Sequence, residues 1–306
     1  MGRYVVRRLL QMIPVFIGAT LLIFLMVNVM GDPVAGLCGE RACDPATAAQ
    51  LEKEFGLDKP LWQQYLTYMG KVFTGDFGTA FNGQPVTELM ATAFPVTVRL
   101  TVVAIFFEIV IGVTLGVVTG LRRGRPVDSG VLLATLVVIS VPTFVTGLLL
   151  QLLLGIRWQW ISPSVRYGTL DELIVPGLVL ASVSLAYVTR LTRTSIAENK
   201  RSDYVRTAIA KGLPRRRVTT RHLLRNSLIP VVTFIGTDIG ALMGGAIVTE
   251  RIFNIHGVGY QLYQGILRQN TQTVVGFVTV LVLVFLVANL LVDLLYAVLD
   301  PRIRYA

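Results

Sequence analysis

Three carboxylates, Glu108, Asp238 and Asp293, interrupt long apolar stretches of this 306-residue chain. Ionisable side chains are costly at membrane depth, and those that occur there commonly bind ions, protons or substrates. A buried ion pair, or a hydrogen bond to a neighbouring helix, is the structural alternative for each of them. Small residues such as Gly240 and Gly244 let helices approach closely or leave one face open. We therefore take Glu108, Asp238, Gly240 and Gly244 as candidate residues of a translocation path.

Sequence motifs of enzymes are missing from the chain. It has no G-x-x-x-x-G-K-[ST] phosphate loop, no H-E-x-x-H and no G-x-S-x-G. Its two histidines, His222 and His256, lie far apart in the sequence and form no cluster of metal ligands. We therefore expect no catalytic residue, no metal site and no cofactor bound by this chain, and a transport or scaffold role follows.

The most basic part of the chain is "YVRTAIAKGLPRRRVTTRHLLRNSLIP", which carries seven Lys or Arg residues and no acid. Anionic lipid headgroups attract such a segment by about 1 kcal/mol per charge. Nucleic acid is disfavoured as a partner, because the segment brings no aromatic platform and no separate binding fold. A docking surface for another protein is the favoured reading, with membrane lipid as the alternative.

The basic stretch is also patterned as two helices. Val205, Ala208 and Ile209 fall at i, i+3 and i+4, which predicts one apolar stripe on a first helix. Gly212 suits the end of that helix, since glycine adopts left-handed backbone geometry without penalty. Pro214 suits the first turn of a second helix. The spacing thus predicts a helix–turn–helix, which is more order than a charged linker requires.

The composition indicates that the solvent of this chain is a lipid bilayer. Hydrophobic residues make up 53% and charged residues 15% of the chain, and the mean hydropathy is +0.65. A membrane helix needs roughly 20 largely apolar residues. Six runs approach or exceed that length: 9–30, 95–120, 130–155, 173–188, 228–248 and 274–298. The sequence therefore predicts an all-α membrane protein with six transmembrane helices.

The Lys and Arg residues divide unevenly between the two sides of this arrangement. The side that holds both termini and the basic stretch carries 19 of them, and the other side carries eight. The positive-inside rule then places both termini in the cytoplasm. The first run is longer than the apolar part of a signal peptide and has no small-residue cleavage site after it, so we expect a retained anchor helix.

The long loop after the first run is predicted to lie outside. It contains Cys38 and Cys43 in "CGERAC", for which a local disulfide is one expectation and two unpaired thiols are the alternative. Apolar residues at helical spacing further along predict a small helical external segment. The expected organisation is an anchor helix at 1–30, an external segment at 31–93, a core at 94–298 that contains a cytoplasmic loop at 190–227, and a cytoplasmic tail at 299–306.

Four stretches resemble one family, the inner-membrane permease subunits of binding-protein-dependent ABC importers. "DYVRTAIAKGLPRRRVTTRHLLRNSLIPVVT" resembles the family's EAA loop, in the form found in the first permease of dipeptide, oligopeptide and nickel systems. "GGAIVTERIFNIHGVG", "FGLDKPLWQQY" with "GDFGTAF", and "RLLQMIPVFIGATLLIF" are similar to the same branch. Arg206, Thr207 and Ala208 replace the general Glu-Ala-Ala, whereas Gly212 is kept. The resemblance extends over essentially the whole chain.

The resemblance implies a type I ABC importer permease in the bacterial inner membrane. An external substrate-binding protein would deliver a dipeptide or oligopeptide to this chain and a second homologous permease. One or two cytoplasmic ATPase subunits would bind the ATP and Mg, and the first span would wrap the partner permease. Two alternatives stay open: the same fold carrying nickel or another small solute, and an autonomous channel or ion-coupled carrier that uses Glu108 and Asp238.

The resemblance also implies that the first helix of the basic stretch couples to an ATPase. The residues carried over to this role are Asp203, Tyr204, Arg206, Thr207, Ala208, Ala210, Lys211, Gly212 and Leu213. We expect Arg215, Arg216 and Arg217 to meet lipid headgroups instead.

Overall fold

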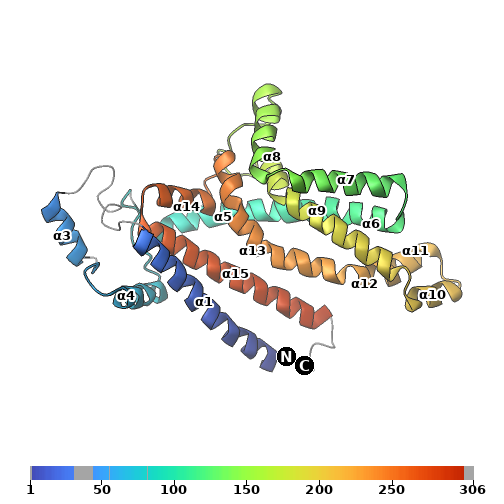
Figure 1. Cartoon of the computed structure of the whole chain (residues 1–306), viewed down its shortest axis with the longest axis horizontal. Helices are drawn as coiled ribbons and strands as arrows, with labels where there is room; N and C mark the ends of the chain where they lie inside the picture. Colours follow the sequence, from blue (N-terminus) through green and yellow to red (C-terminus); the bar gives the residue numbers. More distant parts are fainter. Residues whose placement is uncertain (1, 31–43, 55, 81, 300–306) are drawn as a thin grey trace. The chain divides into compact units, whose positions relative to one another are not determined.

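The computed structural model describes residues 2–30, 44–54, 56–80 and 82–299, most of which are helical (Figure 1). Five helices are long and apolar enough to cross a membrane. A sixth crossing is present if Pro126–Ser140 and Thr143–Arg157, which are bent by 96° at their junction, form one broken span. The predicted all-α membrane fold is confirmed.

The chain divides into two compact units. One combines the residues up to Val98 with Ala246–Leu290, and the other combines Arg99–Gly245 with the residues that follow Leu290. The first unit contains α1 (Gly2–Met30), α3 (Pro45–Glu54), α4 (Leu61–Thr74), the start of α5 (Val86–Phe107), α14 (Val258–Leu267) and most of α15 (Thr271–Leu299). The second contains the remaining helices: α6 (Thr114–Leu121), α7 (Pro126–Ser140), α8 (Thr143–Leu150), α9 (Ile174–Asn199), α10 (Asp203–Ala210), α11 (Arg215–Arg217), α12 (Arg225–Ser227) and most of α13 (Ile229–Ile252).

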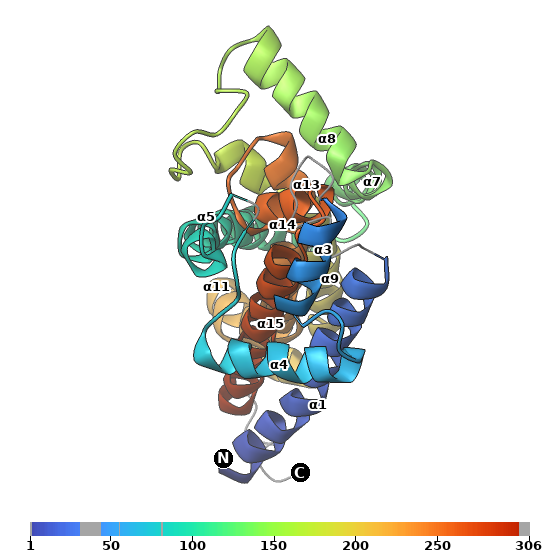
Figure 2. The ribbon, with the colours of Figure 1, turned by 90° about the vertical axis from the view of Figure 1, so that its left-hand side faces the viewer.

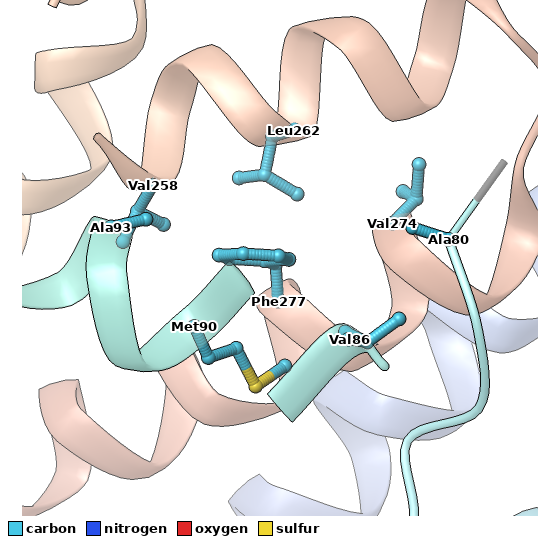
Figure 3. Close-up of a cluster of buried hydrophobic side chains, with 8 residues drawn as sticks. All are labelled: Ala80, Val86, Met90, Ala93, Val258, Leu262, Val274 and Phe277. Carbon is cyan, nitrogen blue, oxygen red and sulfur yellow. The ribbon is translucent and has the colours of Figure 1, made fainter. Parts of the chain in front are cut away.

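The core of the first unit forms around Phe277 of α15 (Figure 3). Met90 and Ala93 approach it from α5, and Val258 and Leu262 approach it from α14. Phe277 is fully buried and stacks on the ring of Phe94 with the ring centroids 6.1 Å apart. This cluster joins α5 to α14 and α15, two consecutive helices that lie far from α5 in the sequence.

The second unit is built on a close seam between α9 and the continuous helix that runs from α5 through a π-helical stretch (Glu108–Val113) into α6. Gly112, Gly116 and Gly120 are spaced four residues apart and all face α9. A Cβ on Gly120 would lie 2.8 Å from the Cβ of Ile196, so only glycine permits this separation of the backbones. The G-x-x-x-G spacing of Gly112 and Gly116 thus serves the close approach of two helices.

Three predicted span boundaries differ from the observed helices. The helix that contains the second run begins at Val86 and continues to Leu121, and its 36 residues measure about 54 Å at 1.5 Å per residue. The third run, 130–155, was expected as one helix but is broken at Val141 and Pro142. The fourth run continues as α9 to Asn199. A run of apolar residues marks only the part of a helix that is compatible with lipid. These helices extend beyond their runs into parts that contact protein, where polar residues are tolerated.

Candidate coupling surface and the turn at Glu250

α10 is the first helix of the basic stretch, and its ends are set locally. Ser202 precedes it in extended geometry, and the helix is followed by Lys211 and by Gly212, whose φ is 73°. The N–H of Gly212 donates to the carbonyl of Ile209 at 2.9 Å. The prediction that Gly212 ends this helix is confirmed, and Pro214 precedes α11 as expected.

One face of α10 is held against the second unit. Val205 and Ala208 are 2% and 4% exposed and pack in a cluster with Ile196 of α9 and with Val218 and Leu223. The predicted stripe is therefore correct for Val205 and Ala208. Because Ala208 faces the interior of this chain, it is not available to a partner. Leu213 packs against the same cluster.

The opposite face of α10 is open. Ile209 is 61% exposed, so its predicted place on the buried stripe is wrong. A helix of eight residues buries a narrow face here, and Ile209 lies one position beyond it. The members of the predicted coupling set that are exposed beside Ile209 are Asp203, Tyr204, Arg206, Thr207, Ala210, Lys211 and Gly212. The resemblance did not single out Ile209, although an exposed isoleucine among charged neighbours is the strongest apolar feature of this surface.

Hydrogen bonds fix both ends of the loop that carries α10. The Ser195 hydroxyl donates to the carbonyl of Ser227 at 2.8 Å in a buried position, which ties α9 to the last residue of α12. The Lys200 ammonium donates to the carbonyl of Leu121 at 3.1 Å. The Tyr204 hydroxyl donates to Asn199 Oδ1 at 2.7 Å. These bonds connect the loop that carries α10 to α6 and α9.

An ion pair that the sequence analysis did not find braces the same end of the unit. Arg193 of α9 donates through Nε and Nη2 to the two carboxylate oxygens of Asp128, at 2.5 and 2.8 Å. Asp128 is 2% exposed and also accepts the N–H of Gly124 at 2.8 Å. Bidentate geometry with a further donor is what makes a buried ion pair favourable. It fixes the loop before α7 onto α9.

The candidate path residues do not share one environment. Glu108 is completely buried in the second unit, and no N–H or O–H group in the described part of the chain donates to its carboxylate, which interacts electrostatically with that of Asp238. Asp238 and Gly240 are half-buried, while Gly244 is exposed with no atom within 4 Å of the position of a Cβ. Within the chain, Gly244 is thus on an open face and Glu108 is enclosed.

A second polar site lies in the first unit, at the turn between α13 and α14. The Thr97 hydroxyl donates to one oxygen of the fully buried Glu250 at 2.5 Å, and the N–H of Tyr260 donates to the other at 2.9 Å. Thr97 also accepts the N–H of Val258 at 2.8 Å. A Cβ on Gly257 would overlap the Glu250 carboxylate. Glu250 and Thr97 together satisfy the first N–H groups of α14, which would otherwise lack partners.

We expect Glu250→Gln to destabilise the first unit. Glutamine keeps one acceptor oxygen in place of two, so either the Thr97 hydroxyl or the Tyr260 N–H loses its acceptor on the side chain. An unsatisfied buried donor costs about 1–3 kcal/mol. Thermal unfolding of the purified chain in detergent measures the loss. Glu52→Gln, at an exposed position of α3, is the matched control and should leave the melting temperature unchanged. Equal melting temperatures for the two variants would contradict the capping role of Glu250.

Two further expectations concern cysteines and metals. Cys38 and Cys43 lie outside the described residues, so the expected disulfide stays a prediction. Within the described ranges, no group of three or more His, Cys, Asp or Glu side chains is arranged to hold a metal ion.

Comparison with known proteins assigns the chain to a family. The family described as "Binding-protein-dependent transport system inner membrane component" matches residues 112–305, and the N-terminal family of the same systems matches residues 1–101. The dipeptide transport system permease protein DppB of Escherichia coli K12 is 39% identical over 337 residues, covering 100% of this chain and 99% of its own. The di/tripeptide permease DppB of Pseudomonas aeruginosa is 37% identical over 99% of this chain and 98% of its own. The glutathione permease GsiC of Pectobacterium atrosepticum is 37% identical over 100% of both chains. This chain belongs to the inner-membrane permease family of binding-protein-dependent ABC importers.

Proposed function

We propose that the chain is the permease subunit through which an ABC importer brings dipeptides or short oligopeptides across the bacterial inner membrane. The observation that carries the proposal is similarity from end to end to permeases named for dipeptides and di/tripeptides. The family is one of transport subunits and not of enzymes, and its members depend on a substrate-binding protein. The ATP and Mg are used by partner ATPase subunits, and a second homologous permease completes the path.

The exposed face of α10 is the contact with the ATPase. It presents an apolar side chain, Ile209, beside Tyr204, while Val205 and Ala208 fix the helix to the unit from behind. Such a mixed apolar and polar face, on a helix held from behind, suits a docking element that must transmit movement. Arg215, Arg216 and Arg217 are exposed beyond the turn, and we assign them to lipid headgroups. Both termini lie in the cytoplasm in this arrangement.

The translocation path runs along the open face of α13. Thr237, Ala241 and Gly244 are exposed at i, i+4 and i+7, and Asp238 lies at the margin of this row. The face needs a partner because small exposed residues on a membrane helix gain little from lipid and favour close helix contact. Glu108 is enclosed and cannot line the path itself. It acts on the path through the electrostatic interaction of its carboxylate with that of Asp238. The transport core then corresponds to 94–298, with the second permease facing α13.

Gly244→Leu is expected to separate folding from transport. No atom lies within 4 Å of the position of a Cβ at Gly244, so leucine fits the isolated chain and its thermal stability should not change. In the assembled importer the same side chain would fill the path or the permease interface, and we expect most ATP-dependent uptake to be lost. Gly130→Leu, at another open helical position, is the control and should transport normally. Normal uptake by the Gly244→Leu variant would contradict the proposal that α13 lines the path.

The cargo is tested by reconstitution. The chain is co-expressed with a second permease, an ATPase and a binding protein from the same organism and placed in vesicles, and ATP-dependent uptake of labelled di- and tripeptides is measured. We expect peptide uptake that requires all subunits. Uptake of nickel or glutathione in place of these peptides would show that the cargo is wrong and that the importer assignment is right. Uptake by the chain alone without ATP would favour a carrier that uses Glu108 and Asp238.

A further inference from the structure

α4 carries an exposed apolar row that no described residue covers. Trp62, Leu66 and Phe73 are 61%, 60% and 81% exposed, and their spacing of four and seven residues places them on one face of the helix. α4 begins after Pro60 and ends at Gly75, whose φ is 76°, so the row extends along nearly the whole helix. A row of this kind on a regular helix indicates a surface with a partner.

The face nearly opposite this row is polar. Gln64, Thr67 and Lys71 follow one another at helical spacing and line a cavity of about 440 Å³. Lys53 and Lys59 also line this cavity, together with Asp76, so its wall carries an excess of positive charge. α4 therefore has one apolar side and one polar side, and the polar side contributes Lys71 to this positively charged wall. This is the pattern of helices that lie in the plane of a membrane interface, with Trp, Leu and Phe toward the acyl chains and Lys toward the headgroups.

A third row of α4 anchors the helix to two spans. The Tyr65 and Thr20 hydroxyls are 2.9 Å apart, and the Tyr68 and Thr279 hydroxyls are 2.6 Å apart. The ring of Phe24 in α1 packs against both tyrosines. Burial raises the pKa of Tyr68 to about 12, so its hydroxyl stays uncharged against α15. Figure 2 shows α4 running across α1 and α15 and not along them.

These anchors set the depth of α4 along the spans. The apolar part of α1 is Val5–Asn28, and Thr20 lies eight residues before its end, which is about 12 Å at 1.5 Å per residue. The apolar part of α15 begins at Thr271, and Thr279 lies eight residues into it, again about 12 Å. Two independent helices thus give the same depth. A hydrocarbon region about 30 Å thick, centred on the apolar parts of α1 and α15, would contain both anchors.

We infer that α4 lies in the outer leaflet of the membrane, with Trp62, Leu66 and Phe73 in contact with lipid acyl chains and its polar face, which carries Lys71, toward the headgroups. The part of the chain expected to form an external cap is then partly embedded. The inference commits to lipid as the occupant because the anchoring depth places the row below the membrane surface, where a water-soluble binding protein does not reach. It does not depend on the cargo or on the coupling surface.

Tryptophan fluorescence in vesicles tests the placement. The chain has three tryptophans, so W158F/W160F leaves Trp62 as the only emitter. The full chain is reconstituted in vesicles whose phospholipids carry bromine on the acyl chains, and in matched vesicles without bromine. We expect Trp62 to lose most of its emission in the brominated vesicles. The matched control adds T67W to W62F/W158F/W160F, which moves the emitter to the polar face, where emission should be largely retained.

A second reporter guards against a variant that folds poorly. F73W in the W62F/W158F/W160F background should be quenched as Trp62 is. Quenching of Trp62 by aqueous iodide instead of brominated lipid would overturn the inference in favour of solvent. Protection from both quenchers, or loss of lipid quenching when the partner permease is bound, would assign the row to a protein interface and likewise overturn it.

Discussion

Replacing Ile209 with Glu is expected to abolish the stimulation of ATP hydrolysis by substrate in the assembled importer, while the chain still folds and inserts. Ile209 is 61% exposed, so the change leaves the packing of this chain intact. In the proposed interface it would place a charge at the centre of an apolar contact. Loss of a central contact typically costs about 2 kcal/mol or more, or roughly 30-fold in affinity. The measurement is ATPase activity with and without substrate-loaded binding protein, together with co-purification of the ATPase.

The control for this prediction is Arg217→Gln. Arg217 is also exposed and lies in α11, just beyond the turn, where we assign it to lipid headgroups. This variant should keep stimulated ATPase activity. If the Ile209 variant is stimulated normally, α10 is not the coupling helix in the way proposed. If only the Arg217 variant loses stimulation, the docking surface is α11.

Gly116→Ala is expected to destabilise the second unit strongly. A Cβ at this position would overlap the Cβ of Thr192 and lie 2.7 Å from the carbonyl oxygen of Thr189. These atoms are at or beside the backbone of α9, so no side-chain rotation relieves the contact. Overpacking of this kind typically costs about 1–3 kcal/mol, and we expect the upper part of that range or more. The melting temperature of the purified chain and its yield from membranes should both fall.

Gly130→Ala is the matched control, because it makes the same change in another helix. No atom lies within 4 Å of the position of a Cβ at Gly130. Alanine is about 1 kcal/mol better than glycine in a helix, so this variant should be as stable as the natural chain or more stable. Equal melting temperatures for the Gly116 and Gly130 variants would show that the seam between α6 and α9 opens without cost.

Local signals predicted the elements of the coupling region well and their orientation less well. Gly212 ends α10 as its chemistry requires, and Val205 and Ala208 are buried as their spacing predicts. Ile209 has the same spacing signal and is exposed. The spacing of apolar residues predicts a stripe on α10 but not how wide the buried part of that stripe is. The width depends on which residues of α9 and of the helical stretch after α10 pack against it.

Polar partners that are far apart in the sequence could not be predicted. Glu250 and Thr97 are separated by 153 residues, and Arg193 and Asp128 by 65. Nothing in either local stretch indicates the other member of the pair. Glu250 did fall within a stretch that resembles the family, which marked the segment but not its capping role for α14. The bend of 96° after Ser140 was also unforeseen, although Pro142 stands at that point.

The sequence by itself determined that this is an all-α membrane protein, that its basic loop forms a helix–turn–helix, and that it resembles importer permeases. Apolar run length, charge asymmetry and glycine and proline chemistry act locally, so they can be read along one chain. Only the tertiary structure decided that Ile209 faces outward, that Glu108 is enclosed while Gly244 is open, and that Tyr65 and Tyr68 hold α4 about 12 Å along two spans. These are properties of contacts between distant segments, and such contacts exist only once the helices have packed.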